Sequence, residues 1–206
     1  MRKITILVLT LFLLGISEGL FGKSVDILFK FPTSFYLSTG DKQHSAPSPV
    51  YFNPGVGLIW PNKGLFSVEP LLSFNYSYYL FYDGKAMPSE IENRTATTLA
   101  FLLEVPATFS INIKSTQLKF HVGPSMLMRF GWLSNGATEA EDIPKINNYF
   151  WSNARFLYFS GGLSWMVNLE KSKFGPYFNI HFPIGSIFAQ EGLNGMILSG
   201  GLKVSL

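Results

Sequence analysis

The stretch FSVEPLLSFNYSY, residues 66–78, decides the fold. Its even-numbered residues are all apolar or aromatic: Phe66, Val68, Pro70, Leu72, Phe74, Tyr76 and Tyr78. Most of the odd-numbered residues between them are small or polar: Ser67, Glu69, Ser73, Asn75 and Ser77. Successive side chains of a β-strand point to opposite faces, so this alternation predicts a strand with one apolar and one polar face.

The same alternation recurs along the chain. It predicts eight strands, in residues 25–37, 50–60, 66–78, 99–111, 118–132, 157–167, 178–184 and 196–206. From Lys23 onward no stretch has a convincing helical pattern. Short connectors (61–64, 112–117 and 170–175) alternate with longer ones (38–49, 83–94, 133–153 and 190–194). An up-and-down meander with short turns at one end and longer loops at the other is typical of transmembrane barrels.

Charge separates the two faces of these predicted strands. The apolar face carries no Asp, Glu, Lys or Arg within any strand. The charged and histidine side chains of the strands share the opposite face and are expected to form a polar network inside a barrel: Asp26, Lys30, Glu69, Glu104, Lys119, His121, Arg129, His181 and Lys203. We expect Asp26 and Lys203 to pair across the seam between the first and last strands. The bulky apolar face then meets lipid, and the small polar face fills a narrow lumen.

A soluble β-sandwich or a lipocalin-like barrel is the alternative, because its strands also alternate. The apolar faces of a sandwich meet in one core about 10 Å thick, whereas here every strand has a bulky apolar face. The sequence therefore favours an all-β, eight-stranded antiparallel up-and-down transmembrane β-barrel. Aromatic residues near the strand ends are expected to form girdles at the membrane interfaces: Trp60, Tyr76, Tyr78, Trp132, Trp151 and Trp165.

The first residues have the layout of a secretory signal peptide. The basic start Met1-Arg2-Lys3 precedes the uncharged run ITILVLTLFLLGI (4–16), and small residues follow at Ser17, Gly19 and Gly22. A transmembrane helix needs about 20 apolar residues, and this run ends sooner, at Glu18. We expect residues 1–22 to be a signal peptide, cleaved after Gly19 or Gly22, and residues 23–206 to be the barrel.

Composition excludes several classes of function. Of the 206 residues only 14% are charged and none is cysteine, which excludes disulfides, a thiolate nucleophile and cysteine-ligated zinc. The 16 Lys and Arg residues against 13 Asp and Glu residues give a formal net charge of +3, and this excess of positive charge is spread along the chain. We therefore expect no nucleic-acid partner.

The leader, the eight strands and the alternating last segment GMILSGGLKVSL (195–206) resemble the small outer-membrane barrels of bacteria, the OmpA, OmpX and OmpW group. The resemblance covers nearly all of residues 23–206 and implies a place in the bacterial outer membrane. Outer-membrane lipid and the barrel-assembly machinery are the partners that it implies. Such barrels typically end in an aromatic residue, usually Phe, and this chain departs from the pattern by ending in Leu206.

Two groups of residues are candidates for chemistry. His44 and Ser45 lie near Asp41 in a long connector, but adjacent loop residues rarely align a nucleophile with its base. His121 and His181 with Glu69 or Glu104 have no spacing that fixes a metal site, so a hydrogen-bonded interior pair is favoured. We therefore expect no catalytic residue, no metal and no cofactor, and a protein that is not an enzyme.

Three functions remain open from the sequence. The first is a structural or surface-binding protein whose rigid barrel displays loops to an extracellular ligand or host molecule. The longest loop, 133–153, carries Glu139, Glu141 and Asp142. The second is a narrow conduit for small hydrophobic molecules, implied by the OmpW resemblance, with prolines at 54, 70, 106, 124 and 183 weakening strand pairing. The third is a lipid-modifying enzyme.

Overall fold

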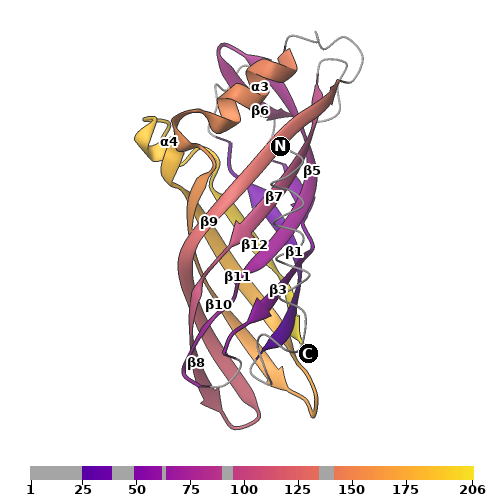
Figure 1. Cartoon of the computed structure of the whole chain (residues 1–206), viewed down its shortest axis with the longest axis vertical. Helices are drawn as coiled ribbons and strands as arrows, with labels where there is room; N and C mark the ends of the chain where they lie inside the picture. The colour runs from indigo at the N-terminus through magenta and orange to yellow at the C-terminus, as the bar shows by residue number, and fades with distance from the viewer. Residues whose placement is uncertain (1–24, 39–48, 62–63, 90–94, 135–141) are drawn as a thin grey trace.

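The chain folds into a closed antiparallel β-barrel of eight wall strands (Figure 1). The computed structural model describes residues 25–38, 49–61, 64–89, 95–134 and 142–206. The expected signal peptide, residues 1–22, and the residues His44 and Ser45 lie outside these ranges. The strands are β1 (Asp26–Tyr36), β2 (Val50–Phe52), β3 (Gly55–Ile59), β4 (Phe66–Val68), β5 (Leu71–Tyr82), β6 (Lys85–Ser89), β7 (Ala96–Glu104), β8 (Ala107–Ile113), β9 (Thr116–Ser134), β10 (Leu157–Asn168), β11 (Lys173–Pro183) and β12 (Ile197–Ser205).

Each wall strand pairs with its neighbours in the sequence, and the last pairs with the first. Three wall strands are divided in two, as β2 with β3, β4 with β5, and β7 with β8. The pairing runs β1, β3, β5, β7, β9, β10, β11, β12 and back to β1. The closing register runs from Leu28 opposite Ser205 to Tyr36 opposite Ile197. The predicted up-and-down barrel is confirmed.

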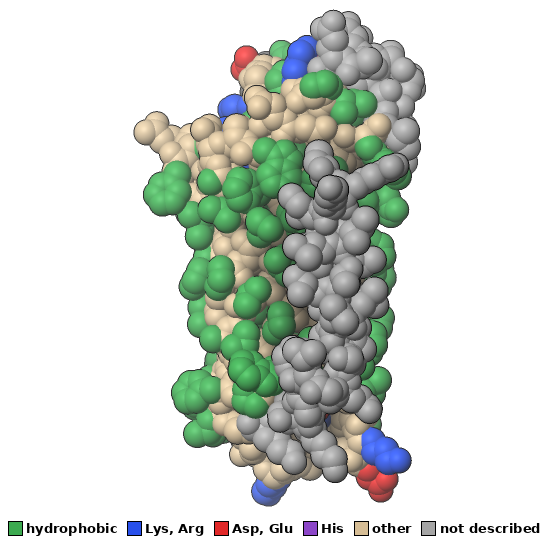
Figure 2. Space-filling view, viewed as in Figure 1, with side chains coloured by type: hydrophobic (Ala, Val, Ile, Leu, Met, Phe, Trp, Pro, Cys, Tyr) green, Lys and Arg blue, Asp and Glu red, His purple; other side chains and the backbone are tan. Residues whose placement is uncertain are grey.

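Burial alternates along the strands as the sequence pattern predicts. In β1 Leu28, Lys30 and Ser34 are buried, whereas Ile27 and Phe31 are exposed. Figure 2 shows hydrophobic side chains over the middle of the wall and charged side chains near its two ends. The outward face is the bulky apolar face, so the exposed surface of the wall suits hydrocarbon rather than water.

Pro54, Pro70 and Pro106 lie at the divisions of three wall strands, and Pro124 lies within β9. Pro lacks a backbone N–H, so each costs its strand one donor. Their carbonyl oxygens nevertheless accept bonds from the neighbouring strands: Phe74 N to Pro54 O (3.1 Å), Leu58 N to Pro70 O (2.9 Å), Glu69 N to Pro106 O (3.0 Å) and Val105 N to Pro124 O (3.1 Å). The wall is therefore hydrogen-bonded at these four prolines.

Helices cover one end of the barrel, although the sequence pattern predicts none. They are α3 (Asp142–Trp151), the 3₁₀ turn η2 (Ser152–Ala154) and α4 (Ile184–Phe188). The strand predicted to end at Ile184 ends at Pro183 instead, and α4 begins at Ile184. Helix α3 buries Ile146, Tyr149 and Phe150, which are spaced three and four residues apart as on one helical face. Within the described ranges, no helix is long and apolar enough to cross a membrane.

The first residues of the connector expected at 83–94 form a hairpin with the preceding strand. Strand β5 extends to Tyr82, the chain turns at Asp83 and Gly84, and β6 pairs back onto β5. Both turn residues have positive φ (46° and 73°), as a two-residue hairpin turn of type I′ requires, and Asp-Gly is a favoured pair for it. This hairpin, α3 and α4 together form what we call the cap, at the upper end in Figure 1. The C-terminus lies at the other end.

Candidate functional site

The lumen contains eight of the nine side chains expected in the interior network. These residues are at most 5% exposed: Lys30, Glu69, Glu104, Lys119, His121, Arg129, His181 and Lys203. Asp26, the ninth, is half-buried at the start of β1. The alternation of side chains between the two faces of a strand places these groups in the lumen, because each lies on the lumen-facing side of its strand.

Glu104 is the centre of the first ion-pair cluster. Lys30 Nζ donates to both of its carboxylate oxygens, at 2.9 and 3.1 Å. Asn179 Nδ2 also donates to Glu104 Oε1 (3.0 Å), and His181 Nε2 lies 3.9 Å from the same oxygen. Three wall strands, β1, β7 and β11, are therefore tied across the lumen by one carboxylate.

Glu69 is the centre of the second cluster and contacts two lysines. Lys119 Nζ donates to Oε1 at 2.8 Å, and Lys203 Nζ donates to Oε2. The seam pairing is thus not the one expected from sequence. In the register of β1 with β12, Lys203 lies opposite Lys30, while Asp26 lies beyond the last paired residue of β12. The shear of the barrel therefore brings Glu69, rather than Asp26, to Lys203.

The two histidines do not form the expected pair with each other. His121 Nε2 hydrogen-bonds to Asn179 Oδ1. Gly162 leaves room for this contact, because a Cβ there would lie 2.7 Å from His121 Nε2 and 2.4 Å from Asn179 Oδ1. Across the described residues, no group of three or more His, Cys, Asp or Glu is arranged to hold a metal ion.

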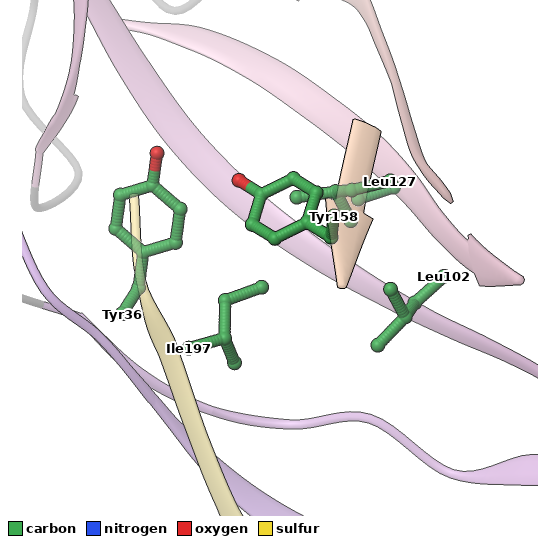
Figure 3. Close-up of a cluster of buried hydrophobic side chains, with 6 residues drawn as sticks. Tyr36, Leu102, Leu127, Tyr158 and Ile197 are labelled. Atoms are coloured by element: carbon green, nitrogen blue, oxygen red, sulfur yellow. The ribbon is translucent and has the colours of Figure 1, made fainter. Parts of the chain in front are cut away.

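A layer of tyrosines and Arg129 fills the lumen nearer the cap. Arg129 donates to the hydroxyls of Tyr36 (3.2 Å) and Tyr79 (3.4 Å), and its guanidinium lies 4.3 Å from the centroid of Phe150. An apolar cluster from several wall strands packs beside it: Tyr36, Ala100, Leu102, Leu127, Tyr158 and Ile197. Figure 3 labels Tyr36, Leu102, Leu127, Tyr158 and Ile197 of this cluster. This layer and the two ion-pair clusters form what we call the plug.

The cap has its own ion pair, which the sequence did not predict. Arg155 Nη2 donates to Glu191 Oε1 at 2.7 Å, and Arg155 Nε donates to Oε2 at 3.2 Å. The hydroxyl of Tyr149 donates to the same Oε2 (3.0 Å), and the guanidinium lies 4.1 Å from the centroid of the Tyr149 ring. This contact fixes α3 to the segment that follows α4. No local pattern indicates it, because the partners are 36 residues apart.

Two cavities flank Tyr149 in the cap. One of about 210 Å³ is lined by Tyr36, Ser38, Lys85, Ala86, Met87, Pro88, Tyr149, Gln190, Glu191 and Asn194. The other, of about 320 Å³, is lined by Phe81, Gly84, Lys145, Asn148, Tyr149, Ser152, Asn153 and Arg155. Hydroxyl, amide and charged side chains around aromatic rings can bind a polar ligand by hydrogen bonds and stacking.

The cap ion pair predicts how the cap responds to pH. Burial alone would raise the pKa of Glu191, but the hydrogen bond and charge of Arg155 outweigh it, so the pKa lies below its usual range. A carboxylate with a lowered folded-state pKa stabilises the fold above its unfolded pKa, about 4.3, and loses that contribution as pH falls through the folded value. The cap should therefore be equally ordered from pH 7 to about pH 5 and loosen below about pH 4.

Limited proteolysis of the cap across that pH range, with an acid-active protease, checks this prediction. The matched control is Glu191→Gln, which cannot titrate at that position and should show a smaller change in cleavage across the same window. Equal acid sensitivity of both proteins would mean that another group controls the loosening.

The expected girdle aromatics lie on the outward face. Trp60, Tyr76, Trp132 and Trp165 are between 51% and 58% exposed. Trp151, at the end of α3, is less exposed because its ring packs against Phe130 (centroids 5.5 Å apart) and Phe156 (5.4 Å). Tyr78 is half-buried. Their placement at the two membrane interfaces stays a prediction.

Comparisons with known proteins identify the fold. No protein-family model matches the chain, and no curated protein matches its sequence. The solved structure of Neisserial surface protein A (NspA) aligns with a TM-score of 0.52 at 7% identity, over 89% of this chain and 97% of that one. Ail, the attachment invasion locus protein of Yersinia pestis, aligns at 10% identity with a TM-score of 0.45, over 88% of this chain and 95% of that one. The structure of Ail in complex with the heparin analogue sucrose octasulfate aligns at 10% identity with a TM-score of 0.46, over 88% of this chain and 96% of that one. The fold of this chain is that of the small eight-stranded outer-membrane β-barrels.

Proposed function

We propose that this protein is an integral outer-membrane protein whose closed barrel anchors the cap at the cell surface, where the cap contacts an extracellular molecule. The observation that carries the proposal is the plug. Two ion-pair clusters and the tyrosine layer cross the lumen beneath the cap, so the barrel is suited to be a rigid scaffold rather than a pore. The apolar outward face and the outer-membrane barrel fold support the location.

The plug argues against the conduit alternative. In the tyrosine layer a cavity of only about 10 Å³ lies among Tyr36, Tyr51, Tyr79 and Arg129. That is about the volume needed to hold one water molecule. The wall also stays hydrogen-bonded through the proline carbonyls, at the places where a lateral opening would need broken pairing. A hydrophobic solute would have to break buried ion pairs or wall hydrogen bonds to pass.

The cap supports the binding half of the proposal. Its two cavities open at one end of the barrel and share Tyr149, whose orientation is fixed by Glu191 and Arg155. A site held by such contacts on a rigid scaffold loses little conformational freedom on binding. The proposal assigns no catalytic step to these residues.

Cysteine labelling on intact cells tests the display of the cap. The chain contains no cysteine, so a single introduced one can be labelled without background. Lys145→Cys places the thiol on α3, where the lysine side chain is 46% exposed, and Lys171→Cys places it in the turn between β10 and β11 at the opposite end. A maleimide carried on a large polyethylene glycol chain should label Lys145→Cys on intact cells and Lys171→Cys only after the outer membrane is permeabilised. The reverse pattern would overturn the proposed orientation.

A further inference from the structure

We infer that the tyrosine layer of the plug binds a monatomic anion of the chloride class, held by Arg129. The described lumen contains more buried cations than buried carboxylates. Among the described residues, the buried cations Lys30, Lys119, Arg129 and Lys203 face only two buried carboxylates, Glu69 and Glu104. Both carboxylates are already engaged by lysines. A buried charge without a counter-charge is costly, so the lumen favours the uptake of an anion.

Of these four cations, Arg129 has no carboxylate partner among the described residues of the lumen. The residue is 3% exposed. Its hydrogen-bond partners are the hydroxyls of Tyr36 and Tyr79 and the carbonyl oxygen of Arg155, all of them neutral. Among the described residues, its Nε atom has no hydrogen-bond partner. Arg129 thus combines a full charge with an unused N–H donor in a desolvated position.

The cavity of about 10 Å³ lies against this side chain and is rich in donors. Its lining includes the phenols of Tyr36, Tyr51 and Tyr79, the amide of Asn75 and the hydroxyl of Ser77, with Arg129 beside them. The hydroxyls of Tyr36 and Tyr79 accept bonds from Arg129, and Tyr79 is also hydrogen-bonded to Tyr36, so the Tyr36 and Tyr51 hydroxyls are the phenols left to donate to an anion. None of the described residues that line the cavity is a carboxylate. Its size is that of about one water molecule, so a halide ion fits with a small outward shift of the lining side chains, whereas phosphate, sulfate and organic acids are too large.

Tyr36 connects this site with the cap. The same residue lines this inner cavity and the larger cavity of about 210 Å³ in the cap. Tyr36 therefore lies between the cap cavity and the cavity beside Arg129. Binding there would add a charge-assisted contact to the plug, and this role is separate from the binding of a surface ligand by the cap.

Thermal unfolding of the refolded protein in detergent tests this inference. Sodium chloride is compared with sodium gluconate at equal concentration, because gluconate is too large for the cavity. Wild-type protein should melt roughly 3–6 °C higher in chloride, the shift expected when a ligand is present at about ten times its dissociation constant. Arg129→Met keeps the length of the side chain without its charge and should lose the difference between the two salts. An equal shift in Arg129→Met, or no shift in wild type, would overturn the inference.

A second variant and a direct measurement cover the case in which Arg129→Met does not fold. Tyr51→Phe removes one donor hydroxyl and leaves Arg129 in place, so the chloride concentration at half-maximal effect should rise about tenfold. In crystals of wild-type protein grown in bromide, an anomalous peak should lie in contact with the Arg129 guanidinium. An ordered water at that position, with no anomalous signal, would contradict the assignment.

Discussion

Replacing Glu69 with Ala is expected to lower the free energy of unfolding of the barrel by about 3–5 kcal/mol, because the variant leaves buried ammonium groups without their counter-charge. Lys119 and Lys203 both donate to this carboxylate, and all three residues are at most 2% exposed. Urea unfolding in detergent or lipid, followed by tryptophan fluorescence, measures the loss.

Two control variants separate this effect from ordinary truncation. Lys119→Met leaves one lysine, Lys203, paired with Glu69 and removes one excess positive charge, so it should cost clearly less than Glu69→Ala. Lys145→Ala removes one partner of the surface pair with Asp142, where the lysine is 46% exposed, and should cost no more than about 1 kcal/mol. If Glu69→Ala cost as little as Lys145→Ala, the cluster would not stabilise the plug.

Replacing Phe120 with Arg is expected to cost up to about 2–4 kcal/mol, the range for a cation at the midplane on the lipid face of a barrel, where costs fall toward the interfaces. Phe120 lies in β9, is 44% exposed, and has Leu163 and Phe109 as its neighbours across the wall. The same unfolding measurement, made in lipid bilayers, gives the cost.

The matched control is Phe120→Leu, which changes the shape of the side chain but keeps it apolar. Its cost should be well below that of the Arg variant, because Leu remains favourable in hydrocarbon. Similar costs for the two variants would show that this face of β9 is not in contact with lipid, and would count against the membrane location.

The eight wall strands and the direction of nearly every strand side chain could be predicted from sequence. The reason is that a period of two is a local property, and a shift of one residue would turn the charged side chains of a strand toward lipid. The eight buried members of the interior network follow from the same rule.

The partners within that network could not be predicted in the same way. Glu69 and Lys203 are 134 residues apart, and their meeting depends on strand register and shear, which the alternation does not encode. The expected pairing of Asp26 with Lys203 requires the strands to be level at the seam. The observed register places Lys30 opposite Lys203 instead.

The cap shows a different limit. The spacing of Ile146, Tyr149 and Phe150 is helical and lies in the sequence, but it spans barely one turn within a segment that the strand pattern leaves as a loop. A helix this short takes its stability mainly from packing, here of Tyr149 and Phe150 in a buried cluster with Tyr79 and Ala86. Those neighbours come from the β5–β6 hairpin, so neither element is evident without the other.

Single-channel recording in a planar lipid bilayer tests the plugged barrel most directly. Refolded wild-type protein, inserted in a bilayer and shown to be folded by its resistance to unfolding in cold dodecyl sulfate, should carry no steady current. The reason is that the two ion-pair clusters and the Arg129 layer cross the described lumen. A steady, reproducible single-channel current from the wild-type protein would contradict the account and favour a conduit.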